Sequence, residues 1–195
     1  QYVWVNHKKM GKISLGQTNS ASNGRSETTF SATNMINASN GVTYGAGIRF
    51  IDTTGGVNSV SAVAAGGITT NLDGLGRADV LRYDTPRFGG LALATSKLGD
   101  GSWDIAGDYR AKYGAVRIRV QAQYNDSSGA APTGTDGSTS FSGAALHDSG
   151  VNGTLAFGWQ HLSTNDATVN TDRGGDGRFW YFNVGYRAKI FGVGS

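Results

Sequence analysis

The segment VRIRVQAQYN, residues 116–125, alternates between apolar and polar side chains at every position. Its even-numbered residues are valine, isoleucine, alanine or tyrosine, whereas its odd-numbered residues are arginine, glutamine or asparagine. Successive side chains of an extended strand point to opposite faces. The segment therefore predicts a strand with one apolar face and one polar face that carries Arg117 and Arg119.

The same period of two recurs along the chain and predicts nine strands. They span residues 2–8, 12–17, 77–84, 90–97, 103–112, 116–125, 138–146, 151–161 and 178–190. Glycine occurs 31 times and proline twice, and a glycine inside a helix costs about 0.5–1 kcal/mol relative to alanine. No cysteine is present to form a disulfide. We expect an all-β protein built around an antiparallel sheet.

The predicted connections fall into two classes that alternate along the chain. KKMG, TPRFG, YGA and HDSG are tight turns, whereas residues 18–76, 126–137 and 163–177 are long, and the short LGDG lies on the side of the long ones. Tight turns on one side and long loops on the other are typical of outer-membrane β-barrels. The strand-like segment 41–52 is expected to lie within the 18–76 connection and to pair with 57–71.

Two folds compete for these alternating strands. In a soluble antiparallel sandwich the apolar face would form a shared core, and the polar face would meet water. In a transmembrane barrel the apolar face would meet lipid and the charged face a water-filled lumen. The barrel is favoured by the length of the strands, by the charges gathered on the polar face, and by aromatic residues of the apolar face near predicted strand ends. These girdle residues are Tyr83, Trp103, Tyr109, Tyr124, Trp159 and Trp180.

Four segments carry a resemblance to a known family: GKISLGQTNSASNG (11–24), VLRYDTPRFGGLALATS (80–96), WDIAGDYRAKYGAV (103–116) and SGAALHDSGVNGTLAFGW (142–159). They resemble the general porins of Gram-negative bacteria, most specifically in GKISLGQ before a long loop and in RYDTPRFGG. The resemblance implies a homotrimer of 16-stranded barrels in the outer membrane, in contact with its lipid and lipopolysaccharide. It also implies that residues 18–76 form the third loop, which folds into the lumen as a pore constriction.

On this resemblance, residues 1–195 form one partial barrel domain, with roughly the fourth to the twelfth strand of a probable 16. The function implied is passive diffusion of ions and small hydrophilic solutes, and the excess of cations on the strands predicts a mild anion preference. The residues expected to line the pore or its constriction are Arg25, Glu27, Arg49, Asp52 and Asp73 on the loop, and Arg82, Asp104, Asp108, Arg110, Arg117, Arg119 and Arg187 on the strands.

Other functions have less support in the sequence. His7, His147 and His161 lack the spacing of metal ligands, no catalytic motif is present, and the chain is not expected to be an enzyme. No nucleic-acid partner is expected, because the net charge is only +3 and no basic run occurs. No cofactor is expected beyond a calcium ion at the loop aspartates of NLDGLG or RGGDG. Two alternatives stay open, namely a substrate-specific uptake channel on the same barrel and a structural or adhesive surface β-protein.

Overall fold

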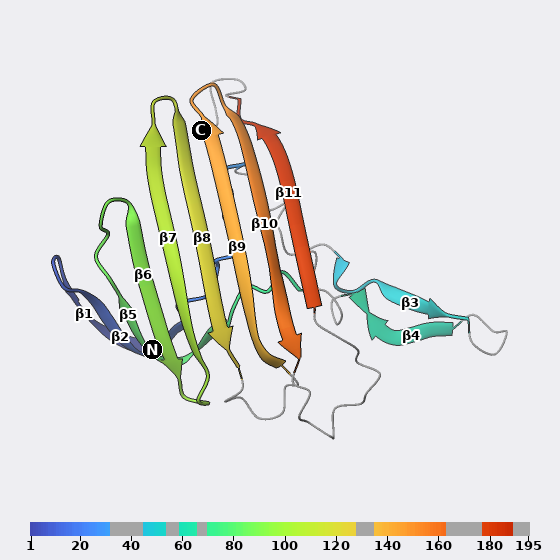
Figure 1. Cartoon of the computed structure of the whole chain (residues 1–195). Helices are drawn as coiled ribbons and strands as arrows, with labels where there is room; N and C mark the ends of the chain where they lie inside the picture. Colours follow the sequence, from blue (N-terminus) through green and yellow to red (C-terminus); the bar gives the residue numbers. More distant parts are fainter. Residues whose placement is uncertain (32–44, 54–58, 66–69, 128–134, 163–176, 189–195) are drawn as a thin grey trace.

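The computed structural model describes residues 1–195 except 32–44, 54–58, 66–69, 128–134, 163–176 and 189–195. Its main element is an antiparallel sheet of nine strands in the order β1-β2-β5-β6-β7-β8-β9-β10-β11 (Figure 1). The strands are β1 (Tyr2–His7), β2 (Gly11–Asn19), β5 (Arg77–Asp84), β6 (Leu91–Leu98), β7 (Trp103–Tyr113), β8 (Val116–Asp126), β9 (Thr135–His147), β10 (Val151–Leu162) and β11 (Gly177–Tyr186). The expectation of an all-β, antiparallel fold is confirmed.

The order of the nine strands in the sheet is the same as their order in the sequence, so the topology is a simple up-and-down meander. Four tight turns, at residues 8–10, 85–90, 114–115 and 148–150, lie at one end of the sheet, called here the tight-turn end. The opposite end carries the three long connections, residues 20–76, 127–134 and 163–176, and also the short connection 99–102. Nine strands were predicted and all nine are found. The last one ends at Tyr186, and residues 189–190 of the span predicted for it lie outside the described residues.

Inside the long connection between β2 and β5 lies a separate two-stranded sheet. Strand β3 (Arg49–Asp52) pairs antiparallel with β4 (Ser59–Ala64), as expected for a hairpin within residues 18–76. Figure 1 shows this hairpin extending away from the main sheet. For residues 49–52, the expected placement in the connection and not in the wall of the sheet is therefore confirmed, whereas residues 41–44 lie outside the described residues.

The sheet is curved but not closed. Strands β1 and β11 form its two edges and do not pair with each other. A closed barrel is therefore not seen in the described part of the chain. No helix in that part is long and apolar enough to cross a membrane.

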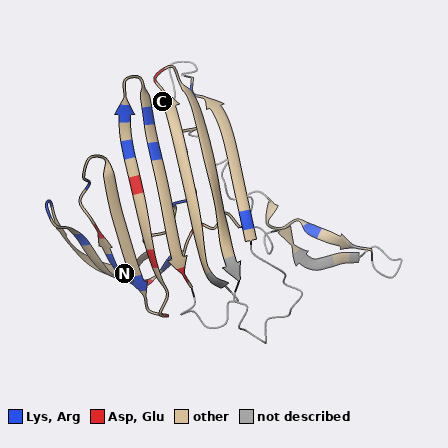
Figure 2. Cartoon of the chain, in the orientation of Figure 1, with Lys and Arg blue, Asp and Glu red and all other residues tan. Residues whose placement is uncertain are grey.

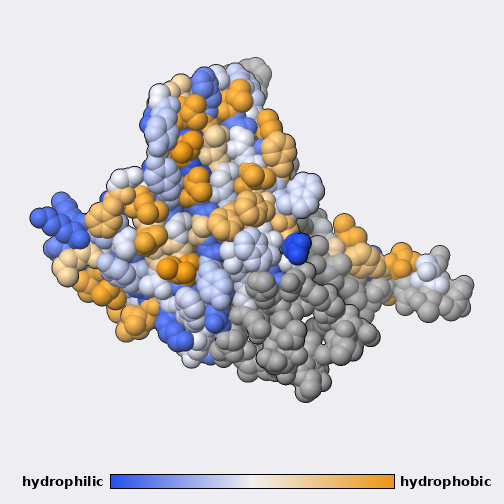
Figure 3. Space-filling view, in the orientation of Figure 1, coloured by the Kyte–Doolittle hydropathy of each residue, from blue (hydrophilic) through white to orange (hydrophobic). Residues whose placement is uncertain are grey.

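The two faces of the sheet have opposite polarity, and the apolar one is exposed. One row across the outer face runs through Leu91, Tyr109, Val120, Gly143, Leu155 and Phe182, which the strand register places side by side. On the outer face of β11, Trp180 is 81% exposed and Phe182 and Val184 are each 64% exposed. Figure 3 shows apolar side chains spread over the visible part of the molecule. An outer face this apolar is the reverse of what a solvated sheet presents.

The inner face is polar, and its middle is buried. A row of this face runs through Ser96, Asp104, Asn125, Ser138 and Gln160. Among the described residues, the buried side chains are mostly serine, asparagine, glutamine, threonine and aspartate. The alternation of VRIRVQAQYN is therefore realised as expected, with Arg117 and Arg119 on the polar side.

The aromatic residues expected near strand ends lie on the outer face, where several of them contact neighbouring side chains. Trp103 and Tyr124 pack with ring centroids 5.5 Å apart, and Phe141 stacks on Phe157 at 5.2 Å. Toward the tight-turn end, the hydroxyl groups of Tyr109 and Tyr113 are hydrogen-bonded at 2.7 Å. Trp159 lies on the same face of β10 and Trp180 on that of β11, while the Tyr83 hydroxyl donates to the Met10 carbonyl at 2.6 Å.

Candidate functional site

Residues 20–31 and 70–76, called here the covering segments, lie against the inner face of the sheet. They begin and end the long connection, and they are joined where it leaves the sheet. The Ser20 amide donates to the Gly76 carbonyl at 2.8 Å, and the Leu75 amide donates to the Ser22 hydroxyl at 3.0 Å. The two segments therefore act as one layer over the polar face.

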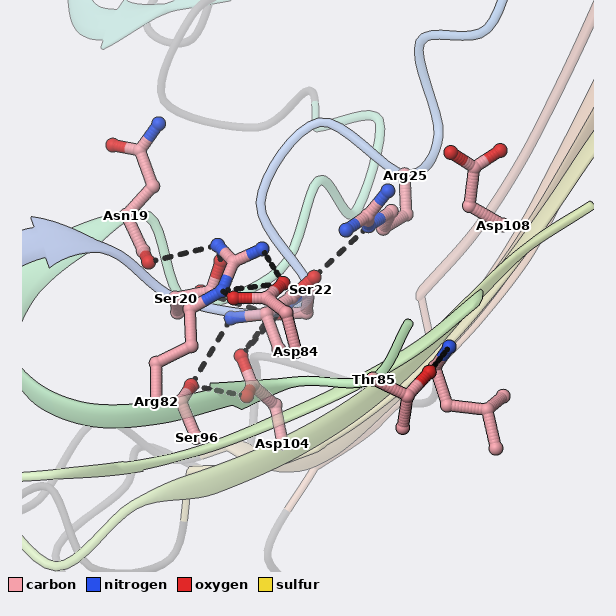
Figure 4. A network of polar contacts seen from close by, with 12 residues as sticks. Asn19, Ser20, Ser22, Arg25, Arg82, Asp84, Thr85, Ser96, Asp104 and Asp108 are labelled. Atoms are coloured by element: carbon pink, nitrogen blue, oxygen red, sulfur yellow. Dashed lines mark hydrogen bonds and ion pairs between the residues drawn. The ribbon is translucent and has the colours of Figure 1, made fainter. Parts of the chain in front are cut away.

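Asp104 on β7 holds the first covering segment in place. Its carboxylate accepts the Ser22 amide at 2.9 Å and the Ser22 hydroxyl at 2.5 Å, and it also accepts the Ser96 hydroxyl. The Ser96 hydroxyl in turn accepts the Ala21 amide at 3.0 Å. Asp104 is fully buried, so this predicted pore residue lies under the covering segment and anchors it (Figure 4).

Further contacts extend the attachment across the sheet. The Ser142 hydroxyl of β9 donates to the Arg25 carbonyl at 2.6 Å, and the Gln123 amide group of β8 donates to the Leu72 carbonyl at 3.1 Å. Thr28 is bonded to Gln121. Hydrogen bonds from β6, β7, β8 and β9 thus hold a loop whose sequence contains few apolar residues. The face beneath it offers hydroxyl, amide and carboxylate groups in place of a hydrophobic core.

Arg82 on β5 ties the entrance of the first covering segment to the wall. It forms an ion pair with Asp84 at 2.6 Å and donates to the backbone carbonyls of Asn19 at 3.1 Å and Ser20 at 2.8 Å. Arg82 and Asp84 are two residues apart on one strand, so both side chains lie on the inner face. Period-two spacing could have identified Asp84 as part of the site, and the sequence prediction missed it.

A second carboxylate, Asp108 on β7, gathers three arginines. It pairs with Arg110 at 2.7 Å, with Arg87 at 3.1 Å and with Arg119 at 3.2 Å. Arg87 comes from the turn between β5 and β6 and was not predicted, because turn residues have no period from which a face can be assigned. The predicted residues Asp108, Arg110 and Arg119 are thus brought together on the inner wall.

Arg25 reaches from the covering segment toward this basic wall. Its Nε donates to the Ala21 carbonyl at 2.9 Å. With the Gln121 amide turned so that both of its ends are satisfied, the Gln121 oxygen accepts from Arg25 Nη1 at 2.7 Å and from Arg119 Nη2 at 3.1 Å. Burial, and after it the positive charge of Arg82, lower the pKa of the Arg25 guanidinium, which stays protonated.

The acidic residues of the covering segments lie together. The Ser26 hydroxyl donates to Asp73 at 3.1 Å, and the Asn71 amide donates to Glu27 at 2.9 Å. Burial, together with the nearby charge of Glu27, raises the pKa of Asp73 to about 6. A small hollow of about 210 Å³ lies beside this pair, between the second covering segment and the inner face of β8, β9 and β10.

The remaining predicted residues lie elsewhere. Arg117 and Arg187 line a hollow at the tight-turn end of the inner face. Arg49 is exposed on β3, in the hairpin that stands away from the sheet, and the side chain of Asp52 lies outside the described residues. Within the described residues no group of three or more histidine, aspartate or glutamate side chains could hold a metal ion. The RGGDG segment lies almost wholly outside them.

Comparisons with known proteins do not identify a family for this chain. No protein-family model matches the chain, and no curated protein or solved structure matches it either. Any function must therefore be inferred from the sheet, its two faces and the covering segments.

Proposed function

We propose that this chain forms part of the wall of an outer-membrane channel through which ions and small hydrophilic solutes diffuse passively. The observation that carries the proposal is the inverted polarity of the sheet, whose exposed face is apolar while its covered face is polar. In the proposed state, further strands continue the sheet from β1 and β11 until it closes. The outer face then meets membrane lipid and lipopolysaccharide, and the inner face meets water.

The exposed apolar surface supports a lipid-facing role. Large apolar side chains are exposed on strands from β1 to β11, among them Val5 at 75%, Leu155 at 51% and Trp180 at 81%. Contiguous apolar patches beyond a few hundred Å² are rare on soluble monomers. A lipid bilayer would cover this surface without requiring a second sheet. The outer aromatic residues, such as Trp103 and Tyr83, would then lie at the two membrane interfaces.

The covering segments would narrow the channel, and their charges would set its selectivity. Arg25 opposes the inner wall near Arg82 and Arg119, whereas Glu27 and Asp73 lie together on the covering side. Ions passing between these groups would experience a field fixed by the hydrogen bonds that hold the loop. The excess of wall cations supports a mild preference for anions. The resemblance to general porins extends the proposal to a homotrimer.

The test is conductance in a planar bilayer under a salt gradient, with the full-length protein extracted in detergent. We expect discrete conductance steps in groups of three and a reversal potential whose sign shows that anions are more permeant than cations. Saturable block by one solute would instead identify a substrate-specific uptake channel. A protein that is soluble without detergent and silent in bilayers would refute the proposal and favour a structural or adhesive surface protein.

A further inference from the structure

The inner faces of β7 and β8 place like charges directly opposite each other near the tight turn that joins them. In the strand register Arg110 pairs with Arg119, and Lys112 pairs with Arg117. Figure 2 shows these basic residues gathered in the half of β7 and β8 next to the turn. Like charges at directly opposed positions destabilise a sheet. Two consecutive pairs of this kind therefore need compensation from another group.

The carboxylates in reach compensate only part of this charge. Asp108 pairs with Arg110 and Arg119, but it also pairs with Arg87. Asp148, in the turn between β9 and β10, pairs with Lys112 at 3.3 Å, and both of these side chains are about half exposed, so water weakens the attraction. Arg117 has no hydrogen bond or ion pair with any described residue and is exposed.

Arg117 faces a hollow of about 310 Å³. The hollow is also lined by Leu146, by Arg187 and by the turn residues 147–150. Within that turn, the Ser149 and Gly150 amides donate to the His147 side chain and carbonyl. The Asp148 carboxylate lines the hollow too but is paired with the Lys112 ammonium, so the two guanidinium groups of the lining, those of Arg117 and Arg187, outnumber its one carboxylate. The volume is at the lower end of the range for small-molecule sites, which suits a small anion.

We propose that this hollow is a binding site for the oxyanion group of a small solute, a phosphate or a carboxylate, held by Arg117 and Arg187, while Lys112 neutralises Asp148 beside it. A guanidinium donates two parallel hydrogen bonds to two oxygens of such a group. The bound oxyanion supplies the negative charge that Arg117 lacks among the described residues. The site lies apart from the covering segments, where Arg82 and Arg25 are already occupied by protein oxygens.

This inference depends on the proposed channel for access to the inner face, and it deepens that proposal. Solutes that carry phosphate or carboxylate groups would be retained at the tight-turn end of the passage. Anion preference would then arise partly from a discrete site and not only from the field at the covering segments. Removal of Arg117 should weaken oxyanion binding and leave the covering segments in place.

The experiment is isothermal titration of the full-length protein in a nonionic detergent with inorganic phosphate, and separately with acetate. Arg117→Gln and Arg187→Gln should each raise the Kd about tenfold, the effect of losing one charge-assisted hydrogen bond. The matched control is Arg178→Gln, which removes an exposed cation from the outer face of β11. The control should keep the wild-type Kd. Equal Kd values in all four proteins, an equal loss in the control, or no binding by the wild type would overturn the site.

Two further measurements separate solute binding from lipid binding and from conductance. Glycerol phosphate should bind with the same dependence on Arg117, whereas dependence seen only with phosphatidylglycerol in mixed micelles would overturn the assignment to a solute. Bilayer conductance, measured on the same preparations, tests the channel independently. A channel that conducts but shows no Arg117-dependent binding would refute the site alone. Arg117-dependent binding by a protein that never conducts would support the site and refute the channel.

Discussion

Replacing Asp104 by alanine should release the first covering segment from the sheet. The substitution removes an acceptor that receives the Ser22 amide at 2.9 Å, the Ser22 hydroxyl at 2.5 Å and the Ser96 hydroxyl. Hydrogen bonds to a charged group contribute about 1.5–3 kcal/mol each. New hydrogen bonds from the freed donors to water offset part of that loss. Because water can reach Ser22 once the segment lifts, we expect a net loss of about 2–3 kcal/mol.

That loss corresponds to an increase of about 30- to 150-fold in the lifted fraction. The chain contains no cysteine, so Thr28→Cys gives a single thiol at a position of the first covering segment that is 2% exposed. Its rate of modification by a water-soluble maleimide reports how often the segment lifts. We expect the rate to rise by the same factor when Asp104→Ala is added.

Asp79→Ala is the matched control, because Asp79 is exposed on β5 and its side chain faces the outer side. It should leave the modification rate unchanged. Asp104→Asn, which keeps an acceptor oxygen but loses the charge, should give an intermediate rate. A rate in Asp104→Ala equal to that of the control would refute the role of Asp104 as the anchor. Far-UV circular dichroism on each variant separates lifting of the segment from loss of the sheet.

The two faces of the sheet and the covered charges lead to three further predictions. The folded-state pKa of Asp73 is raised to about 6, so the folded protein binds more protons than the unfolded chain between about pH 4 and 6. The free energy of unfolding should therefore fall as pH rises through this range. Asp73→Asn should flatten that dependence on pH when unfolding is measured by denaturant titration. Phe182→Arg should cost about 2–4 kcal/mol of folding free energy in bilayers, whereas Asn183→Arg on the opposite face should cost far less; equal costs would contradict the assignment of the faces. Arg82→Gln should move the reversal potential toward cations, and an unchanged potential would show that Arg82 does not contribute to ion selectivity.

The alternation of side chains made the faces of the sheet predictable. In residues 116–125 every apolar side chain was assigned to one face, and the register of β8 with β7 and β9 agrees. Strand ends were less predictable, because they depend on where a partner strand stops; β11 ends where Tyr186 meets Val151 of β10. The local pattern of side chains does not predict where the partner strand ends.

The anchoring of the covering segments could not be predicted from spacing. Ser22 and Asp104 are 82 residues apart, and neither belongs to a motif that indicates a contact between them. Nor does period two explain Leu146, an apolar residue that is buried on the polar face of β9. It lines the hollow beside Arg117, so its role depends on the neighbouring strands and the turn.

The bond between Ser20 and Gly76 closes the long connection at its base. Strands β2 and β5 are paired as far as Asn19 and Arg77, and the Ser20 amide reaches the Gly76 carbonyl one step further on. The stability of the sheet should therefore depend little on the number of residues between Ser20 and Gly76, because the entropic cost of closing a loop grows only slowly with its length. We therefore expect that the hairpin of β3 and β4 can be shortened, exchanged or used to carry an inserted tag while β2 and β5 keep their register. In evolution, the same neck would let this part of the surface diverge quickly while the sheet stays unchanged.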